Sequence, residues 1–197
     1  MKQKKGTICI AIGLLCLAAA LVLTIYNIYE GKQAEQASKT VLSQLDSVIE
    51  ETKEENWKSN VIVDREMPTI EIDGYRYIGV LEIEAIELRL PVMEEWDYER
   101  LKIAPCRYAG SVYQDNMIIA GHNYARHFSP IKNLPVGTEI SFTDVEGVKY
   151  QYVLQMVDIL GANQGEALKE GDWDLSLFTC TYGGGNRYVA RCVRIAE

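Results

Sequence analysis

A cysteine, a histidine and an arginine stand at the ends of three strand-like segments of this sequence. Cys180 ends the run LFTC, His122 ends the run IAGH, and Arg187 begins the run RYVAR. A thiolate forms near neutral pH when an imidazole or a cation lies beside it. A tetrahedral oxyanion requires a fixed hydrogen-bond donor, which a guanidinium can supply. The three residue types together predict covalent acyl-transfer chemistry with Cys180 as the nucleophile.

The surroundings of these residues favour them over neighbours of the same type. Cys180 is followed closely by three consecutive glycines, so its strand ends in a loop, where functional residues concentrate. His127 lies in a polar segment, which predicts a residue of a surface loop. Arg191 shares a strand face with Arg187 by parity, but Arg187 is nearer the strand end. The alternative is that Cys180 is a buried strand cysteine and His122 is structural.

The other four cysteines predict no further chemistry. Cys9 and Cys16 lie in an N-terminal apolar run, and Cys106 and Cys192 have the pattern of small buried residues. A disulfide between Cys106 and Cys192 is the less favoured alternative. No CxxC motif and no His/Cys spacing typical of zinc occurs, so we expect no metal site.

Composition limits the classes of partner. The chain has 197 residues and a formal net charge of −8, and 48% of its residues are hydrophobic. This length and composition predict one folded domain with an appendage. A face that binds nucleic acid must be basic, so an acidic chain argues against a nucleic-acid partner.

The N-terminus has the pattern of a membrane anchor. Residues 7–26 contain no charged residue and follow three lysines within the first five positions. A run of about 20 apolar residues spans a bilayer as a helix, and the lysines favour the cytoplasmic side. We expect residues 1–28 to be a cytoplasmic tail and transmembrane signal-anchor, with the rest of the chain extracellular. The alternative is a signal peptide cleaved near residues 18–20, but the apolar run continues past them.

Residues 29–68 predict a helical stalk and a linker. Small and aliphatic residues recur in this segment at helical spacing, at Ala34, Ala37, Val41, Leu45 and Val48. A coiled coil between two copies is the alternative, but its seam is short and holds two alanines. Residues 60–68 are expected to link the stalk to the folded domain.

The folded domain, residues 69–197, has the pattern of a mainly β protein. Short apolar or alternating segments recur between turn signals, and short helices are expected at 96–102 and 129–133. The expected strands include 77–83, 86–92, 116–120, 140–143, 148–159, 175–179 and 188–195. Seven or eight short strands in about 120 residues favour a closed or nearly closed β-barrel.

In this order and spacing, the motifs resemble the sortase family, the membrane-anchored cysteine transpeptidases of Gram-positive bacteria. The likeness covers residues 77–195. The run IAGH is similar to the family's histidine motif, and LFTC is similar to its TLxTC motif, with Ser176 in place of the usual first threonine. Arg187 aligns with the family's catalytic arginine at the start of the last strand. The resemblance implies a closed eight-stranded β-barrel.

The resemblance also implies a reaction. Cys180 would attack the backbone carbonyl of a Leu-Pro-x-Thr-Gly-like sorting signal, usually between Thr and Gly, and form a thioester. His122 would protonate the leaving amine and deprotonate the incoming one, which belongs to a cell-wall precursor or a pilin lysine. Arg187 and the backbone N–H of Thr181 would bind the oxyanion. This chemistry needs no metal and no organic cofactor, and its partners are sorting-signal proteins.

Three alternatives to this assignment predict different features. The Ser-His-Gly-Cys run of an L,D-transpeptidase is absent, and in a papain-like peptidase the cysteine precedes the histidine. A non-catalytic β-domain that binds a wall component predicts a buried, unreactive Cys180. Within the sortases, the long helical insertion expected of class B is missing, so a class A-like or D-like enzyme is expected.

Overall fold

A computed structural model describes residues 2–56 and 66–195, so most of the linker predicted at 60–68 lies outside the described residues. The described part contains one long helix, nine strands and four short 3-10 helices. The long helix is α1 (Lys2–Asn56). The strands are β1 (Ile70–Ile72), β2 (Tyr75–Ile83), β3 (Leu88–Met93), β4 (Cys106–Ala109), β5 (Met117–Ala120), β6 (Glu139–Asp144), β7 (Lys149–Gly161), β8 (Leu175–Cys180) and β9 (Asn186–Arg194). The short helices are η1 (Glu84–Ile86), η2 (Arg100–Lys102), η3 (Ser129–Asn133) and η4 (Glu166–Leu168).

The strands form one sheet that closes into a barrel. Their order is β1-β2-β3-β4-β5-β8-β9-β7-β6, and pairing of β6 with β2 closes the ring. The pairs β3–β4 and β5–β8 are parallel, and the other pairs are antiparallel. The predicted closed eight-stranded β-barrel is confirmed, because β2 to β9 complete the ring. β1 is an additional strand that pairs with the start of β2 and was not predicted.

Alternation along each strand divides the apolar side chains between the inside and the outside of the barrel. In β8, Leu177 belongs to the inner cluster and Phe178 to the outer one. Large side chains such as Phe142 and Tyr152 fill the interior and are fully buried. The barrel therefore has a packed core, and a binding site has room only at its ends or on its outer face.

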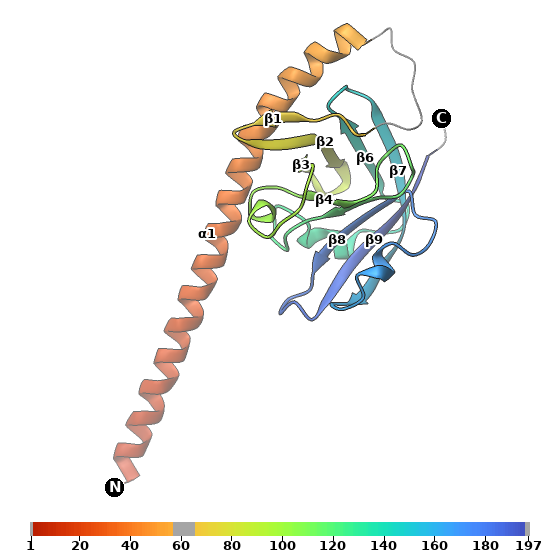
Figure 1. Cartoon of the computed structure of the whole chain (residues 1–197). Helices are drawn as coiled ribbons and strands as arrows, with labels where there is room; N and C mark the ends of the chain where they lie inside the picture. Colours follow the sequence, from red (N-terminus) through yellow and green to blue (C-terminus); the bar gives the residue numbers. More distant parts are fainter. Residues whose placement is uncertain (1, 57–65, 196–197) are drawn as a thin grey trace.

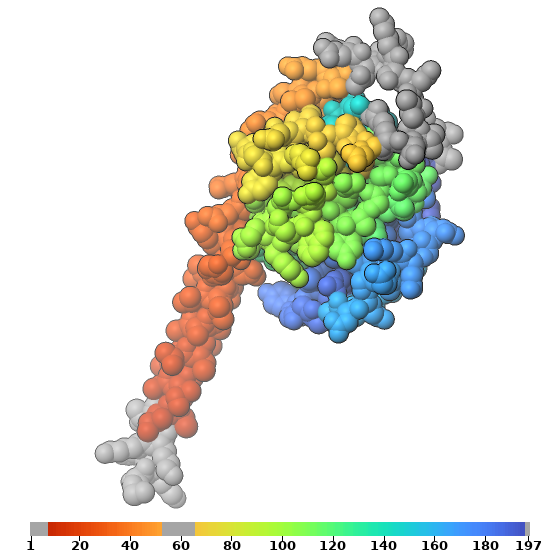
Figure 2. Space-filling view, in the orientation of Figure 1, coloured from red at the N-terminus to blue at the C-terminus, as the bar shows by residue number. Residues whose placement is uncertain are grey.

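The C-terminal half of α1 lies along one side of the barrel (Figure 1, Figure 2). Val41, Leu42, Leu45 and Ile49 of this half are buried in the outer cluster together with barrel residues. Burial of four such side chains contributes several kcal/mol, on the order of 1.5–3 kcal/mol each. The helical spacing predicted for the stalk is present, but its apolar face packs against the barrel. The same packing covers the face that a coiled coil would use.

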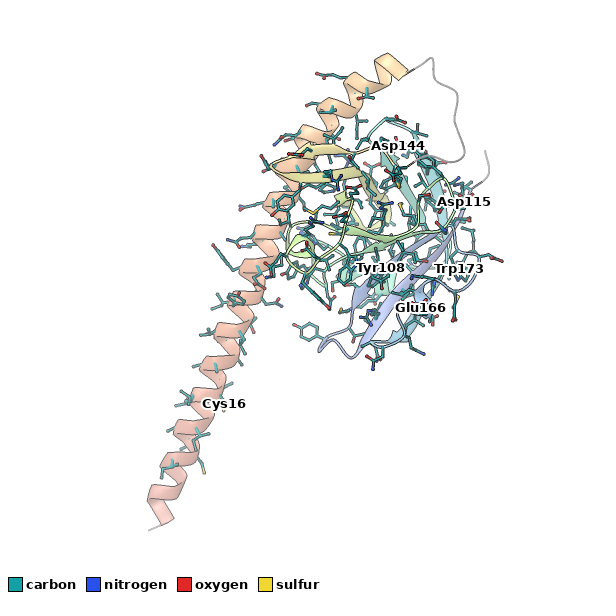
Figure 3. The ribbon with its side chains drawn as sticks, in the orientation of Figure 1. Cys16, Tyr108, Asp115, Asp144, Glu166 and Trp173 are labelled. Carbon is teal, nitrogen blue, oxygen red and sulfur yellow. The ribbon has the colours of Figure 1, made fainter. Side chains whose placement is uncertain are left out.

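The N-terminal half of α1 extends beyond the barrel (Figure 1). Large apolar side chains from Ile8 to Tyr29 are exposed, and Cys16 lies on this part of the helix, far from the barrel (Figure 3). Its length and composition are those of a helix that can cross a membrane. Because α1 is continuous, this apolar half is joined without a break to the half that packs on the barrel.

The loops between strands contain little regular structure. η3 occupies the segment predicted as helical at 129–133, whereas η2 covers only the last part of the helix predicted at 96–102. The η2 segment nevertheless packs on the barrel, because Leu101 and Ala104 belong to the outer cluster. It forms one wall of the site described next.

Candidate active site

Parallel pairing of β5 and β8 puts the predicted histidine and the predicted cysteine at the same end of the barrel. Ala120 lies opposite Phe178, and the N–H of Gly121 donates to the carbonyl of Phe178 at 2.9 Å. His122 and Cys180 each follow this pair by two residues, so both lie at the same end of the barrel. The Cys180 thiol is free and the residue is exposed.

Antiparallel pairing of β8 and β9 completes the group. Arg187 lies directly opposite Cys180 in the ladder. Its guanidinium is half-buried, and it donates to the carbonyl of Ala162 and, at 3.5 Å, to that of Gly161. These contacts tie Arg187 to the connection between β7 and β8. Both bonds use Nη1, so they hold the guanidinium in place on the strand opposite Cys180 and leave its other N–H groups as candidate donors.

Arg191 shares the face of Arg187, as the parity of the strand predicts, but its surroundings differ. It is 3% exposed. It donates to the carbonyls of Ala167 and Leu168 at 2.7 Å and to Oγ of Ser176 at 3.0 Å. Arg191 therefore holds the β7–β8 connection against the barrel, and this structural role leaves Arg187 as the arginine next to Cys180.

The backbone N–H of Thr181 already has an acceptor. It donates to the carbonyl of Asn186 at 2.8 Å, and the N–H of Asn186 donates to Oγ1 of Thr181 at 3.1 Å. These two bonds close the turn between β8 and β9. The expectation that the Thr181 N–H binds an oxyanion requires a free donor, and in this structure the donor is occupied.

The ring of His122 is half-buried and lies flat against Tyr124. The ring centroids are 3.8 Å apart and the planes are 11° from parallel. Nδ1 of His122 is buried and has no hydrogen-bond partner among the described residues. Burial lowers the pKa of His122, the charge of Glu30 opposes this by raising it, and that of Lys102 lowers it further. The net lowering favours a neutral imidazole at neutral pH, which is the form that accepts a proton.

Gly121 is required by the packing under this histidine. A Cβ atom at Gly121 would lie 2.3 Å from the ring of Phe128, well inside van der Waals contact. Phe128 is fully buried and its N–H donates to the carbonyl of His122 at 3.1 Å. The loop from His122 to Phe128 thus folds back over the glycine, which fixes the path of the chain at His122.

The prediction that His127 is a surface residue is wrong. The side chain is 0% exposed and lies edge-on to Tyr124, with ring centroids 5.7 Å apart. Burial, with a smaller effect from His122, lowers the pKa of His127 to about 4. The polar residues around it suggested a surface loop, but packing of α1 near Ala34 covers it. That contact joins segments about 90 residues apart and leaves no local signal.

An aromatic cleft leads to the cysteine. Its walls come from the η2 segment, from β4 and β8, and from the β7–β8 connection. Its large apolar lining residues are Trp96, Tyr98, Leu101, Tyr108, Leu168 and Phe178, and Cys180 and Arg187 also line it. The rings of Tyr108 and Phe178 meet edge to face at 5.3 Å, and Trp96 packs on Tyr108 at the same centroid distance. Tyr108 and Glu166 mark this region in Figure 3.

The sequence did not single out these aromatic residues. Trp96 and Tyr98 stand in the segment expected to be a short helix and Tyr108 lies outside it, so nothing indicated that they share a wall. An apolar cleft with a few polar groups at one end is the usual form of a ligand site. Here the polar groups are a thiol and a guanidinium, so the cleft can hold an apolar segment with a carbonyl at Cys180.

The remaining thiols and acidic groups suggest no other centre. Cys106 and Cys192 are free, so the alternative of a disulfide between them is not realised. They lie in the outer and inner clusters respectively, and burial raises the pKa of each thiol to about 12. In residues 2–56 and 66–195 no group of three or more His, Cys, Asp or Glu side chains is placed to hold a metal ion.

Comparison with known proteins agrees with this geometry. A family model described as "Sortase domain" matches residues 81–196. A search of curated protein sequences finds no match to this chain. Among solved structures, the chain is similar to a Clostridium perfringens sortase D5 transpeptidase, with a TM-score of 0.58 and 21% identity over 84% of this chain and 99% of that one.

Two further solved structures have the same fold. Sortase C of Streptococcus pneumoniae has a TM-score of 0.58 and 18% identity over 80% of this chain and 97% of its own. Sortase A of Corynebacterium diphtheriae has a TM-score of 0.55 and 17% identity over 86% of this chain and 93% of its own. The family match covers more than half of the chain, and the closed barrel agrees with it: the chain belongs to the sortase family.

Proposed function

We propose that this protein is a membrane-anchored cysteine transpeptidase. It cleaves an LPxTG-like sorting signal in a substrate protein and joins that substrate protein to an amine. The observation that supports the proposal is strand pairing. Cys180 pairs with Arg187, both residues line an apolar cleft, and His122 follows the strand that pairs with β8. The exposed Cys180 argues against the alternative of a non-catalytic domain, which predicts a buried thiol.

The first half-reaction would form a thioester. The neutral His122 accepts the proton of the Cys180 thiol, and the thiolate attacks the carbonyl carbon of the scissile peptide bond. The carbonyl oxygen becomes an oxyanion, to which Arg187 donates hydrogen bonds. Protonated His122 then gives its proton to the leaving amine. The C–N bond breaks, the Gly-bearing peptide departs, and an acyl group is left on sulfur.

The second half-reaction reverses these roles. The amine of a cell-wall precursor or a pilin lysine attacks the thioester carbonyl, and His122 takes up the proton that the amine loses. The C–S bond breaks, and His122 returns that proton to the Cys180 thiolate. The product is a new amide bond, and the enzyme is restored without any net redox change or cofactor.

The cleft would bind the apolar part of the sorting signal. Trp96, Tyr108 and Phe178 line it, and they suit the leucine and proline that precede the scissile bond. Arg187 at the end of the cleft would then lie at the scissile carbonyl. Sortases of classes A, C and D are all among the similar structures, and the expectation of a class A-like or D-like enzyme stays a proposal.

The N-terminal half of α1 would anchor the enzyme. We place the three lysines near the N-terminus in the cytoplasm and the barrel on the extracellular side. The division into an anchor (1–28), a juxtamembrane helix and linker (29–68) and a catalytic domain (69–197) follows from this placement. Both the sorting-signal protein and a lipid-linked acceptor would then reach the enzyme at the membrane.

The test is product analysis with the full-length chain in detergent micelles. The enzyme is incubated with a panel of LPxTG-type peptides and with either a glycine-based amine or a lysine-containing peptide. We expect a new product in which the amine is joined to the threonine carbonyl. Absence of cleavage and of transfer across the panel would contradict the proposal.

A further inference from the structure

The membrane helix reaches the histidine of the site through two side chains. Glu30 of α1 accepts a hydrogen bond from the hydroxyl of Tyr124 at 3.4 Å. Its other carboxylate oxygen accepts one from the hydroxyl of Tyr26 at 2.8 Å. Tyr124 in turn lies flat against the ring of His122. A continuous path of contacts thus runs from the end of the apolar half of α1 to His122.

The helix α1 packs closely against the loop from His122 to Phe128. A Cβ atom at Gly31 would lie 4.0 Å from Cβ of Tyr124, an ordinary contact distance. One turn further along α1, Ala34 is 2% exposed, and the fully buried His127 lies close to the backbone of Ala34. Glu35 lies 3.8 Å from the guanidinium of Arg126. The contact is therefore an interface of two helical turns, and it fixes where Glu30 lies.

Charges from three elements act on His122. Glu30 from α1 is the negative one and favours the protonated imidazole. Lys102 from η2 disfavours the protonated imidazole. His127 lies in the loop that follows His122, and His122 contributes to the lowered pKa of His127. Tyr124 is neutral and offers a ring face and a hydroxyl. Among the described residues, Glu30 is the acidic group that raises the pKa of His122.

We propose that Glu30 and Tyr124 are positioning residues for His122, so that the membrane helix is part of the active site. Tyr124 would fix the plane of the imidazole by stacking. Glu30 would hold the Tyr124 hydroxyl and supply the negative charge that steadies the imidazolium formed after thiol deprotonation. The role of His122 rests on the proposed function, but the coupling between the helix and His122 can be measured without activity.

The chain suits a direct measurement, because it contains just two histidines. Full-length protein labelled with ¹³C at histidine Cε1, in detergent micelles, gives two NMR signals to follow against pH. His127→Gln assigns them. We expect Glu30→Gln to move the midpoint of His122 to lower pH, because the charge that raises its pKa is removed.

Glu35→Gln is the matched control. Glu35 lies on the same helix beside Arg126 and Lys39, and no effect of Glu35 on His122 is expected. Equal midpoints for His122 in the wild type and in Glu30→Gln would overturn the proposal. So would an equal shift in Glu30→Gln and Glu35→Gln, which would indicate a general effect on helix docking.

Kinetics separate positioning from a structural role. Tyr124→Leu removes the stacked ring, and we expect kcat to fall about tenfold with little change in KM, because a small misplacement of a catalytic group slows chemistry. Tyr124→Phe keeps the ring and should recover most of this loss. Failure of the wild type to turn over any peptide would count against the proposed function, whereas an unmoved His122 midpoint counts against the coupling.

Discussion

Each end of the β8–β9 ladder holds one cysteine and one arginine, but in opposite environments. At one end Cys180 lies opposite Arg187. At the other end Arg191 lies opposite Ser176, and Cys192 is the next residue of β9. Cys192 is 0% exposed and belongs to the inner core, whereas Cys180 is exposed and lines the cleft. The buried Arg191 guanidinium donates three hydrogen bonds within the protein.

This difference shows that position on the strand, rather than residue type, sets the environment of each thiol. Burial in an apolar core raises the pKa of Cys192 to about 12, so it stays a thiol at neutral pH. At the open end the strand leaves the barrel wall, and the space beside Cys180 is a cleft. The same ladder therefore carries a structural end and a candidate catalytic end.

The largest difference is expected between the two cysteines. Cys180→Ala should abolish acyl transfer while leaving the thermal unfolding midpoint nearly unchanged, because the residue is exposed. Cys192→Ala should keep activity and cost about 1 kcal/mol of stability, since it leaves a small void in the core. Peptide-transfer assays and thermal unfolding check both. Full activity in Cys180→Ala would end the account.

The two arginines should differ next. Arg187→Lys should lower kcat/KM on the order of 100-fold, because lysine cannot reproduce the planar donor fork next to Cys180. Arg191→Lys should cost about 2 kcal/mol of stability through lost hydrogen bonds to carbonyls, with a smaller effect on kcat/KM. Steady-state kinetics and thermal unfolding distinguish them. Equal losses of kcat/KM would contradict the specific role of Arg187 at the oxyanion.

The buried histidine, His127, makes stability depend on pH. The pKa of His127 is lowered to about 4 in the fold, against about 6.5 in an unfolded chain. The unfolded chain therefore binds more protons between these values, and stability present above pH 6.5 is lost as the pH falls toward 4. The loss approaches about 3 kcal/mol at pH 4.

Thermal unfolding of the full chain in micelles, followed from pH 7 to pH 4, measures this loss. His127→Leu should show a flatter dependence than the wild type over this range, because it removes the buried group that gains a proton on unfolding. Parallel curves for the two proteins would show that His127 does not contribute.

The smallest effect is expected in the cleft. Trp96→Ala should raise KM for an LPxTG-type peptide about fivefold with kcat nearly unchanged, because Trp96 packs on Tyr108 in the wall and lies away from the reacting atoms. Steady-state kinetics with a peptide series give both constants. An unchanged KM would indicate that the peptide does not use this wall.

Local pattern was enough to predict a closed or nearly closed β-barrel and to select His122, Cys180 and Arg187 as candidates; the sortase resemblance supplied the number of eight strands. Strand alternation and motif order are carried by neighbouring residues. Strand pairing then puts Cys180 opposite Arg187, and His122 follows the strand that pairs with β8. Contacts between distant segments were not predictable in this way. The docking of α1 on the barrel, the burial of His127 and the aromatic wall all depend on residues far apart in the chain.

The backbone of Thr181 shows a second limit. Sequence order places its N–H directly after the nucleophile, where an oxyanion donor is often found, but the hydrogen bond to Asn186 is made by the turn geometry. Glycines with positive φ at Gly183 and Gly184 allow that turn. Their presence indicated a loop, but it did not indicate which donors the loop would use.

The most direct test of the central claim is the site of acylation. Full-length enzyme is mixed with an LPxTG-type peptide, and the acyl-enzyme is mapped by mass spectrometry, with Cys180→Ala as the control. The account predicts a thioester on Cys180, with Cys106 and Cys192 unmodified, and its release by an added amine. No adduct across a panel of sorting-signal variants, together with a Cys180 thiol that small alkylating agents do not modify, would contradict it.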